Sequence, residues 1–492
     1  MKAVFLALLG AVLSVLAFPP FGPGILVLPG IALFLTALRL ADNRGYGLVV
    51  GSVYGLTFFG GLMWWLAELE LLALVLVPVQ TAFLAVYGWW LSRYNDRTSG
   101  TWLLLAAGGW AVMELVRYRF PVGGLEWGAA GYALSDNLYL RLPAAAIGTS
   151  GLTVLIVLMA GVLALALSRR WDRRLFWSIP IVFLAMVATI PSIIFHVDTG
   201  ERRVAIVQGS TPCPFEHCPP DERLRTYEQH LALTGTIEPG AVDLVVWSEG
   251  STGATNADPV LNEEIREAIG EQARRIGAAM LVGGDRVVSD TEWVNANVYF
   301  NSDGEIVGEY RKQHPVPFGE YIPLRPIFEW IPALERVPRD MIRGDGPVIL
   351  GDDGLGSVIS FEGGFSRYAL EARRAGATII VVATNEASYG PDAPTSEQFI
   401  GMTRMRAVEL GVPIIHAAVT GKSTITDKQG NFTGTTDLGT GEIFYGQVGA
   451  TTSTPFTATG NVLMWAAALI GFVTVARRRW LVSSQTQQLE EE

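Results

Sequence analysis

The most informative stretch of this chain reads Arg311-Lys312-Gln313-His314-Pro315-Val316-Pro317-Phe318-Gly319-Glu320-Tyr321. Pro315 and Pro317 fix their φ angles and lack an N–H group, so the stretch cannot lie inside a helix or a central strand. We therefore predict a rigid, extended loop that holds Lys312 and Glu320. Loops on a folded scaffold commonly carry functional side chains, which makes this pair a candidate for catalysis. A surface loop with two solvated charges is the alternative, and the rest of the chain decides between them.

The composition limits the class of protein. The chain has 492 residues, of which 50% are hydrophobic and only 17% charged, so it is not one ordinary soluble domain. Its formal charge of −11 argues against a nucleic-acid partner. The two cysteines, Cys213 and Cys218, are too few for a disulfide scaffold and lack zinc-like spacing. A local disulfide and two separate thiols both stay open. We expect no metal and no cofactor.

Eight apolar runs have the length of membrane spans. They cover residues 3–18, 24–41, 46–66, 70–92, 101–117, 143–168, 176–196 and 459–476. Almost no charged residue interrupts them, which argues against buried helices of a soluble protein. The first run resembles a signal peptide, but Phe18-Pro19-Pro20-Phe21-Gly22 follows it without a small-residue cleavage site, so we expect it to be retained. Seven spans then form a membrane domain in residues 1–198, and the eighth belongs to residues 456–492.

The positions of lysine and arginine predict the orientation, because cytoplasmic connections are rich in both. The basic residues at alternate connections and at both ends are Lys2, Arg39, Arg44, Arg93, Arg97, Arg169, Arg170, Arg173, Arg174 and Arg477–Arg479. Both termini are therefore expected in the cytoplasm and residues 199–455 outside it. Arg117, Arg119 and Arg141 break the pattern. We attribute them to snorkelling at span ends, with contact to lipid phosphates or to a substrate head group as the alternative.

Residues 199–455 have the composition of a globular domain. Short β-rich runs occupy 204–208, 242–247, 279–283, 296–301, 357–361, 378–384 and 413–419, and helical patterns lie near 221–236, 259–276, 365–375 and 395–410. Strands that alternate with helices predict an α/β layered domain. The stretch is long enough to bury a full core of its own.

Polar residues stand at the ends of two of these strands. Glu249 follows the strand 242–247, while Ser360 and Glu362 end the strand 357–361. Lys312 comes from the proline-containing loop between them. A single strand-end carboxylate is often only a cap. Several polar residues at separate strand and loop ends, in a chain whose strands are otherwise apolar, predict convergence on one pocket.

Several motifs, in this order along the chain, resemble those of the apolipoprotein N-acyltransferase family. They are Phe18-Pro19-Pro20-Phe21-Gly22, Gly123–Gly128, Val207-Gln208-Gly209, Trp247-Ser248-Glu249, Lys312–Tyr321, Thr384–Gly390 and Arg404–Glu409. The match over Lys312–Tyr321 is the most specific, and the resemblance runs almost end to end. It implies a polytopic α-helical membrane domain of about eight spans, joined to an extracytoplasmic nitrilase-like αββα sandwich.

The resemblance also implies a Glu–Lys–Cys triad. Carried over to this chain, Glu249 is the general base, and Lys312 is the cation that stabilises a developing oxyanion. Glu320 and Glu362 become accessory carboxylates that orient the lysine and the substrate.

The position of the family's nucleophilic cysteine holds Ser360, and Phe361 stands where a tyrosine is usual. Serine needs a general base throughout its attack, whereas a cysteine thiol is partly ionised near neutral pH. Three interpretations stay open: a working serine nucleophile, an inactive paralogue, or a cysteine changed to serine on purpose. The retained acidic and basic residues favour the first or the third over decay.

The implied reaction moves a fatty acyl group from a membrane phospholipid, through an acyl-enzyme, to the α-amino group of a lipoprotein's diacylglyceryl-cysteine in a bacterial plasma membrane. The candidate substrate-binding residues are Trp247, Tyr321, Asn385, Phe328 and Trp330. The apolar segment Ile327–Pro332 fits either a lid that dips into the bilayer or core packing. A membrane-anchored nitrilase-type amidase and a non-catalytic lipid- or lipoprotein-binding protein are the alternative functions.

Overall fold

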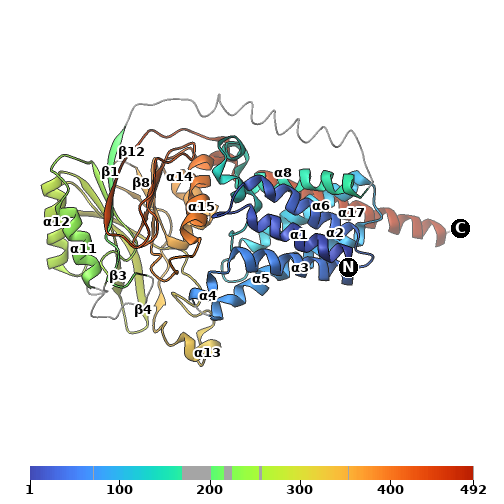
Figure 1. Ribbon diagram of the computed structural model, residues 1–492, viewed down its shortest axis with the longest axis horizontal. Helices are drawn as coiled ribbons and strands as arrows, with labels where there is room; N and C mark the ends of the chain where they lie inside the picture. The colour runs from blue at the N-terminus through green and yellow to red at the C-terminus, as the bar shows by residue number, and fades with distance from the viewer. Residues whose placement is uncertain (70, 169–200, 215–223, 254–256, 353, 491–492) are drawn as a thin grey trace. The chain divides into compact units, whose positions relative to one another are not determined.

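The computed structural model describes residues 1–69, 71–168, 201–214, 224–253, 257–352 and 354–490. The chain divides into two compact units, one of Met1–Ile193 with Ala458–Glu492 and one of Ile194–Thr457. The first unit is a bundle of helices, and the second contains stacked β-sheets flanked by helices (Figure 1). The question of whether Cys213 and Cys218 pair involves a residue outside the described part of the chain.

The first unit consists of apolar helices. Its principal helices are α1 (Lys2–Leu16), α2 (Val27–Arg39), α3 (Arg44–Leu62), α5 (Leu76–Leu91), α6 (Ser99–Arg117), α8 (Ala144–Leu167) and α17 (Val462–Glu490). Four described segments are long and apolar enough to cross a membrane: Arg44–Leu62, Ala73–Tyr94, Ser99–Arg117 and Ala144–Leu167. The unit therefore has the character of a membrane domain.

The predicted count of eight spans is not confirmed. The spans expected at 3–18, 24–41 and 459–476 coincide with the shorter apolar helices Lys2–Leu16, Gly24–Arg39 and Val462–Arg477. The span expected at 176–196 lies outside the described residues.

Two arginines that were expected to snorkel are buried instead. Arg117 is 1% exposed, forms an ion pair with Glu114 at 3.0 Å and donates to the Trp127 carbonyl oxygen at 2.8 Å. Arg141 is 2% exposed and donates to the Ser135 carbonyl oxygen at 3.1 Å. A buried guanidinium is tolerated when its N–H groups find acceptors, and the structure shows an ion pair and hydrogen bonds for Arg117 and a hydrogen bond for Arg141. The snorkelling interpretation is therefore wrong for these two residues.

The second unit is built on two β-sheets. The larger has the strand order β12–β1–β2–β3–β4–β5, with β6 paired to β4, and the smaller has the order β11–β10–β9–β8–β7. The strands are β1 (Arg202–Gln208), β2 (Leu244–Trp247), β3 (Ala279–Val287), β4 (Glu292–Phe300), β5 (Ile306–Arg311), β6 (Asp340–Met341), β7 (Ile349–Leu350), β8 (Leu355–Ile359), β9 (Ile379–Thr384), β10 (Ile414–Ala418), β11 (Thr424–Thr426) and β12 (Glu442–Val448). Strands β1, β2 and β3 run parallel, as do β8, β9 and β10.

The two sheets share one apolar core, to which residues of both contribute. A second cluster fills the space between the larger sheet and helices α11 (Leu224–Gly235) and α12 (Glu263–Ile276). Helices α14 (Ser366–Arg374) and α15 (Thr395–Leu410) pack on the smaller sheet. Figure 1 shows the resulting order of layers, helices, sheet, sheet and helices. The predicted αββα sandwich is confirmed.

The sequence pattern missed some strands and misplaced several strand ends, among them that of β3, which continues to Val287 where 283 was expected. Strand β4 begins at Glu292, four residues before the expected 296. Its inward-facing positions include the polar residues Asn295 and Asn297, so its first half lacks the apolar alternation expected of a strand. Strands β5, β6, β7, β11 and β12 were not predicted. β12 is an edge strand that pairs with β1, and its mixed exposure lacks a clear period of two.

The alternation along β2 determines where Trp247 lies. Leu244 and Val246 belong to the core between the sheets, whereas Val245 and Trp247 belong to the cluster beneath α11 and α12. Trp247 is fully buried, and its Nε1–H donates to Thr234 Oγ1 at 2.9 Å. The structure therefore gives Trp247 a packing role, which corrects its expected part in substrate binding.

Replacing Trp247 with alanine tests this assignment. Trp247→Ala leaves a cavity between sheet and helices and should lower the free energy of unfolding by about 3–5 kcal/mol. Trp330, which is 76% exposed, provides the matched control, and Trp330→Ala should change stability by less than about 0.5 kcal/mol. Denaturant titration of the purified proteins in detergent measures both. Equal stability of the two variants would contradict the packing role.

Candidate active site

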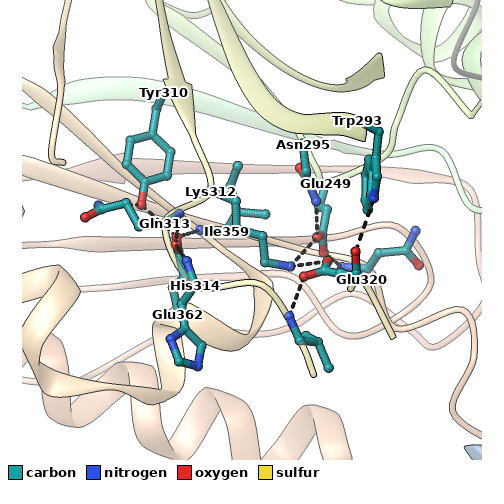
Figure 2. Close-up of polar contacts among 12 residues, drawn as sticks. Glu249, Trp293, Asn295, Tyr310, Lys312, Gln313, His314, Glu320, Ile359 and Glu362 are labelled. Atoms are coloured by element: carbon teal, nitrogen blue, oxygen red, sulfur yellow. Dashed lines mark hydrogen bonds and ion pairs between the residues drawn. The ribbon is translucent and has the colours of Figure 1, made fainter. Parts of the chain in front are cut away.

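Lys312 is the first residue after β5 and lies fully buried. Its backbone N–H donates to the Asn295 carbonyl oxygen at 3.0 Å, which continues the ladder of β4 and β5 by one residue. Its Nζ lies 3.1 Å from Glu249 Oε1 and 2.5 Å from Glu320 Oε1. Figure 2 shows the three side chains pointing toward one another. The structure thus brings together three of the residues that the sequence singled out.

The charge on Lys312 depends on its two carboxylate partners. Burial alone lowers the pKa of Lys312, but the negative charges of Glu249 and Glu320 outweigh burial and raise it above the ordinary value. Lys312 therefore stays protonated near neutral pH. It can stabilise a developing negative charge, and it cannot act as a base.

Glu249 is held by three separate elements. It follows β2, is 6% exposed, and accepts from Asn295 Nδ2 at 2.8 Å in addition to Lys312. Its other oxygen accepts from the backbone N–H of Asn385 at 2.8 Å. A Cβ at Gly283 would lie 2.9 Å from the Glu249 Cα atom, so only glycine allows β3 to approach this closely. The carboxylate is fixed in position, as a general base has to be.

The loop that follows Lys312 is a closed turn. Glu320 Oε2 accepts from the backbone N–H of Val316 at 2.7 Å, and the Phe318 N–H donates to the Tyr321 carbonyl oxygen at 2.8 Å. The two prolines fix their φ angles and so restrict the backbone conformations that are open to the turn. The predicted loop without helix or central strand is confirmed, but it folds into a closed turn where an extended course was expected. Glu320 both closes this turn and contacts the lysine.

Glu362 connects this loop to the end of β8. It is fully buried, and one of its oxygens accepts from the backbone N–H groups of Gln313 and His314. The other accepts from Tyr310 Oη at 2.7 Å and from the Ile359 N–H at 2.8 Å. Burial raises its pKa to about 7, although the N–H donors act in the opposite direction. None of these hydrogen bonds involves the Lys312 ammonium. Glu362 instead holds the backbone that follows Lys312 and the backbone that precedes Ser360.

Ser360 follows Ile359 and opens a short 3₁₀ turn, Ser360–Gly364. Its φ of 50° lies in the left-handed region, which costs a non-glycine residue on the order of 1–3 kcal/mol. Such strain is typical of residues whose side chain a site has to present in one direction. Phe361 packs against the rings of His314 and Phe365, with centroids 5.5 and 4.9 Å away. Ser360 remains partly exposed, as a nucleophile has to be.

The expected substrate-binding residues lie at different places. Asn385 is exposed and contacts Glu249 through its backbone, while its side chain accepts from the Ala387 N–H. The Tyr321 ring lies beneath the guanidinium of Arg343, 5.6 Å from its carbon atom. Phe328 ends the short helix α13 (Arg325–Phe328) and meets the Phe318 ring edge to face. The exposed Trp330 follows it.

Two polar residues of the site were missed from the sequence. Asn295 and Asp285 lie opposite each other on β4 and β3. The sequence did contain one indication of Asn295. Asn295, Asn297 and Tyr299 alternate along β4, so one face of this strand changes from apolar to polar toward its start. Among the described residues no cluster of His, Cys, Asp or Glu has the makings of a metal site.

Two family models match the chain. The carbon-nitrogen hydrolase model matches residues 203–455, and the model of the apolipoprotein N-acyltransferase N-terminal domain matches residues 10–162. The chain belongs to the carbon-nitrogen hydrolase family.

Curated relatives named apolipoprotein N-acyltransferase match almost the whole chain. The relative from Nitrosomonas europaea is 28% identical over 94% of this chain and 95% of its own length. The relative from Geobacter metallireducens is 29% identical, with coverages of 90% and 91%. Among solved structures, a carbon-nitrogen hydrolase from Helicobacter pylori G27 matches with a TM-score of 0.40 and 17% identity, covering 50% of this chain and 89% of that one.

Proposed function

We propose that this chain is an N-acyltransferase that moves a fatty acyl group from a membrane phospholipid to the α-amino group of a lipoprotein's diacylglyceryl-cysteine. One observation carries the proposal: a buried lysine held between two carboxylates, on a domain joined to helices that can span a membrane. The names of the relatives agree with this activity. We propose the domain limits 1–198, 199–455 and 456–492.

The first half-reaction uses Ser360 as nucleophile. Glu249 takes the proton of the Ser360 hydroxyl while the oxygen attacks the ester carbonyl of the phospholipid. The Lys312 ammonium stabilises the tetrahedral oxyanion, and the lysophospholipid leaves with the proton held by Glu249. An oxoester on Ser360 remains. The amine of the lipoprotein then attacks this ester, and the proton it loses returns to Ser360 through Glu249.

Glu320 and Glu362 position the reacting groups. Glu320 fixes the lysine and its loop, and Glu362 fixes the backbone beside Lys312 and before Ser360. Phe361 packs under this turn. Because every group in the scheme belongs to the chain, the reaction needs no cofactor.

The substrates call for a surface that meets the bilayer. Around α13 three large apolar side chains are strongly exposed: Leu324 at 67%, Ile327 at 58% and Trp330 at 76%. Exposure favours a lid in contact with lipid over core packing for this segment. We assign Tyr321, Asn385, Phe328 and Trp330 to the substrate side of the site.

The topology follows from the same proposal. Eight spans, with both termini in the cytoplasm, leave residues 199–455 on the outer face of a bacterial plasma membrane. Lipid donor and lipid-anchored acceptor then both reach the site from the outer leaflet. The arginine and lysine positions support this orientation.

Acyl transfer to a lipopeptide tests the function. A diacylglyceryl-cysteine peptide with a free α-amine should gain the mass of one acyl group when it is incubated with the protein and phospholipid. Lys312→Met removes the oxyanion cation and should lower the transfer rate by about 10²–10³. Lys428→Met, the same change in the turn after β11, should leave the rate within about twofold.

The alternatives give other products in the same assay. Release of free fatty acid without acylated peptide would indicate a hydrolase. Retention of lipid without any turnover would indicate the binding protein that Ser360 leaves open.

The lid is tested by Phe328→Ser combined with Trp330→Ser. Turnover of phospholipid in vesicles should fall about tenfold more than turnover of a water-soluble short-chain ester, because the lost apolar surface matters only at the bilayer. Tyr445→Ser, at an exposed aromatic residue on β12, is the control. A loss of folding in the double variant, seen by near-ultraviolet circular dichroism, would favour core packing.

A further inference from the structure

A row of side chains on β3 and β4 leads from the core into the active site. The antiparallel register pairs Leu281 with Tyr299, Gly283 with Asn297, and Asp285 with Asn295. Leu281 and Tyr299 belong to the core between the two sheets. Since side chains two residues apart share a face, Asp285 and Asn295 lie on this same inner face, beyond the core.

Both residues of the last pair present a shielded oxygen without a donor. Asn295 is 3% exposed, and its Nδ2 donates to Glu249, but its Oδ1 accepts no hydrogen bond within the described residues. The same holds for Oδ1 of Asp285. A buried acceptor without a partner is costly, and an acceptor pair in an active site points to a ligand that brings the donors.

The charge balance indicates that this ligand is a cation. The Lys312 ammonium contacts Glu249 and Glu320, and the carboxyl group of Asp285 interacts electrostatically with all three. Burial and the neighbouring carboxylates, with Asp258 contributing least, raise the pKa of Asp285 to about 7, while Lys312 opposes this rise. Asp258 itself is buried and lies 3.4 Å from the guanidinium of Arg286. Negative charge is therefore in excess beside Lys312.

We propose that Asp285 and Asn295 form the subsite that binds the α-ammonium group of the acceptor, and that Asp285 takes the first proton from it. The proposal rests on the function proposed above. An ammonium offers three N–H donors and one positive charge, which matches two free oxygens and surplus negative charge. It has no lone pair for attack, so it must lose a proton before an amide can form.

The proton balance is complete within the site. The ammonium gives one proton to Asp285, and the neutral amine attacks the carbonyl carbon of the oxoester on Ser360. The attacking nitrogen loses its second proton to Glu249. The bond between the carbonyl carbon and Ser360 Oγ breaks, and the serine oxygen takes that proton. Asp285 releases its proton to solvent. An α-amino group has a pKa of about 7.7–8.0, close enough to that of Asp285 for the transfer to be nearly balanced.

Binding of two matched lipopeptides tests the subsite without requiring turnover. The full-length protein in detergent should bind a diacylglyceryl-cysteine peptide with a free α-amine about 10- to 100-fold more tightly than its N-acetyl form. Asp285→Asn should abolish this preference. Asp290→Asn, the same change in the exposed β3–β4 turn, should retain it. Asp285→Glu, which keeps the charge, should restore part of it. A preference unchanged in Asp285→Asn would overturn the proposal.

The subsite could also bind the primary ammonium of a phosphatidylethanolamine head group. Kinetic measurements distinguish this donor from the lipopeptide acceptor. After acylation by phosphatidylglycerol, Asp285→Asn should transfer the acyl group to the peptide amine at pH 7 about 10- to 100-fold more slowly than the parent protein. Release by hydroxylamine, which is neutral at this pH, should differ far less. An effect confined to acylation by phosphatidylethanolamine would assign the ammonium to the donor and overturn the proposal. A parent protein that binds the free amine selectively but never becomes acylated would contradict the proposed function and leave the subsite standing.

Discussion

The burial of one ammonium group governs the architecture of the site. Lys312 has no exposed surface, and a lone charge in such a place would cost several kcal/mol. Two carboxylates from different elements compensate it, one after β2 and one in the loop after β5. Both carboxylates contact the same ammonium, so the strand end and the loop have to be held together around it. The interaction is thus a constraint on the fold and, in the proposed mechanism, also the means of stabilising the oxyanion.

Glu362 transmits this constraint to Ser360, the proposed nucleophile. Its four hydrogen bonds tie the residues after Lys312 to the residue before Ser360, across the two sheets. Ser360, whose φ of 50° is strained, directly follows the residue that Glu362 holds. A serine in place of a cysteine changes the acidity of the nucleophile and leaves these backbone contacts intact. This explains how the geometry of the site persists with Ser360.

Much of this was predictable from local chemistry, and the rest depended on tertiary contacts. The prolines around Val316 exclude regular structure, so the loop and its lysine could be located from the sequence. Glu249 and Ser360 could be located because they end apolar strands. The side on which Trp247 lies depends on the register of β2 within the sandwich, and its position next to Glu249 in the sequence was misleading. Asp285 could not be assigned because its partner, Asn295, comes from a strand pairing that local pattern does not specify. Arg117 was misjudged because its contact with the Trp127 carbonyl oxygen exists only in the folded bundle, and because its pairing with Glu114, three residues earlier on the same helix, was overlooked.

The mass of the intact protein after incubation with phospholipid shows whether Ser360 carries the acyl group. The protein should gain one fatty acyl group, Ser360→Ala should gain none, and Ser360→Cys should gain one at least as fast, since a thiol is the more reactive nucleophile. This result would identify Ser360 as the acceptor of the acyl group beside a working Glu249 and Lys312. Acylation of the cysteine variant alone would show an intact site that serine has silenced. Absence of acylation in all three proteins would contradict the account.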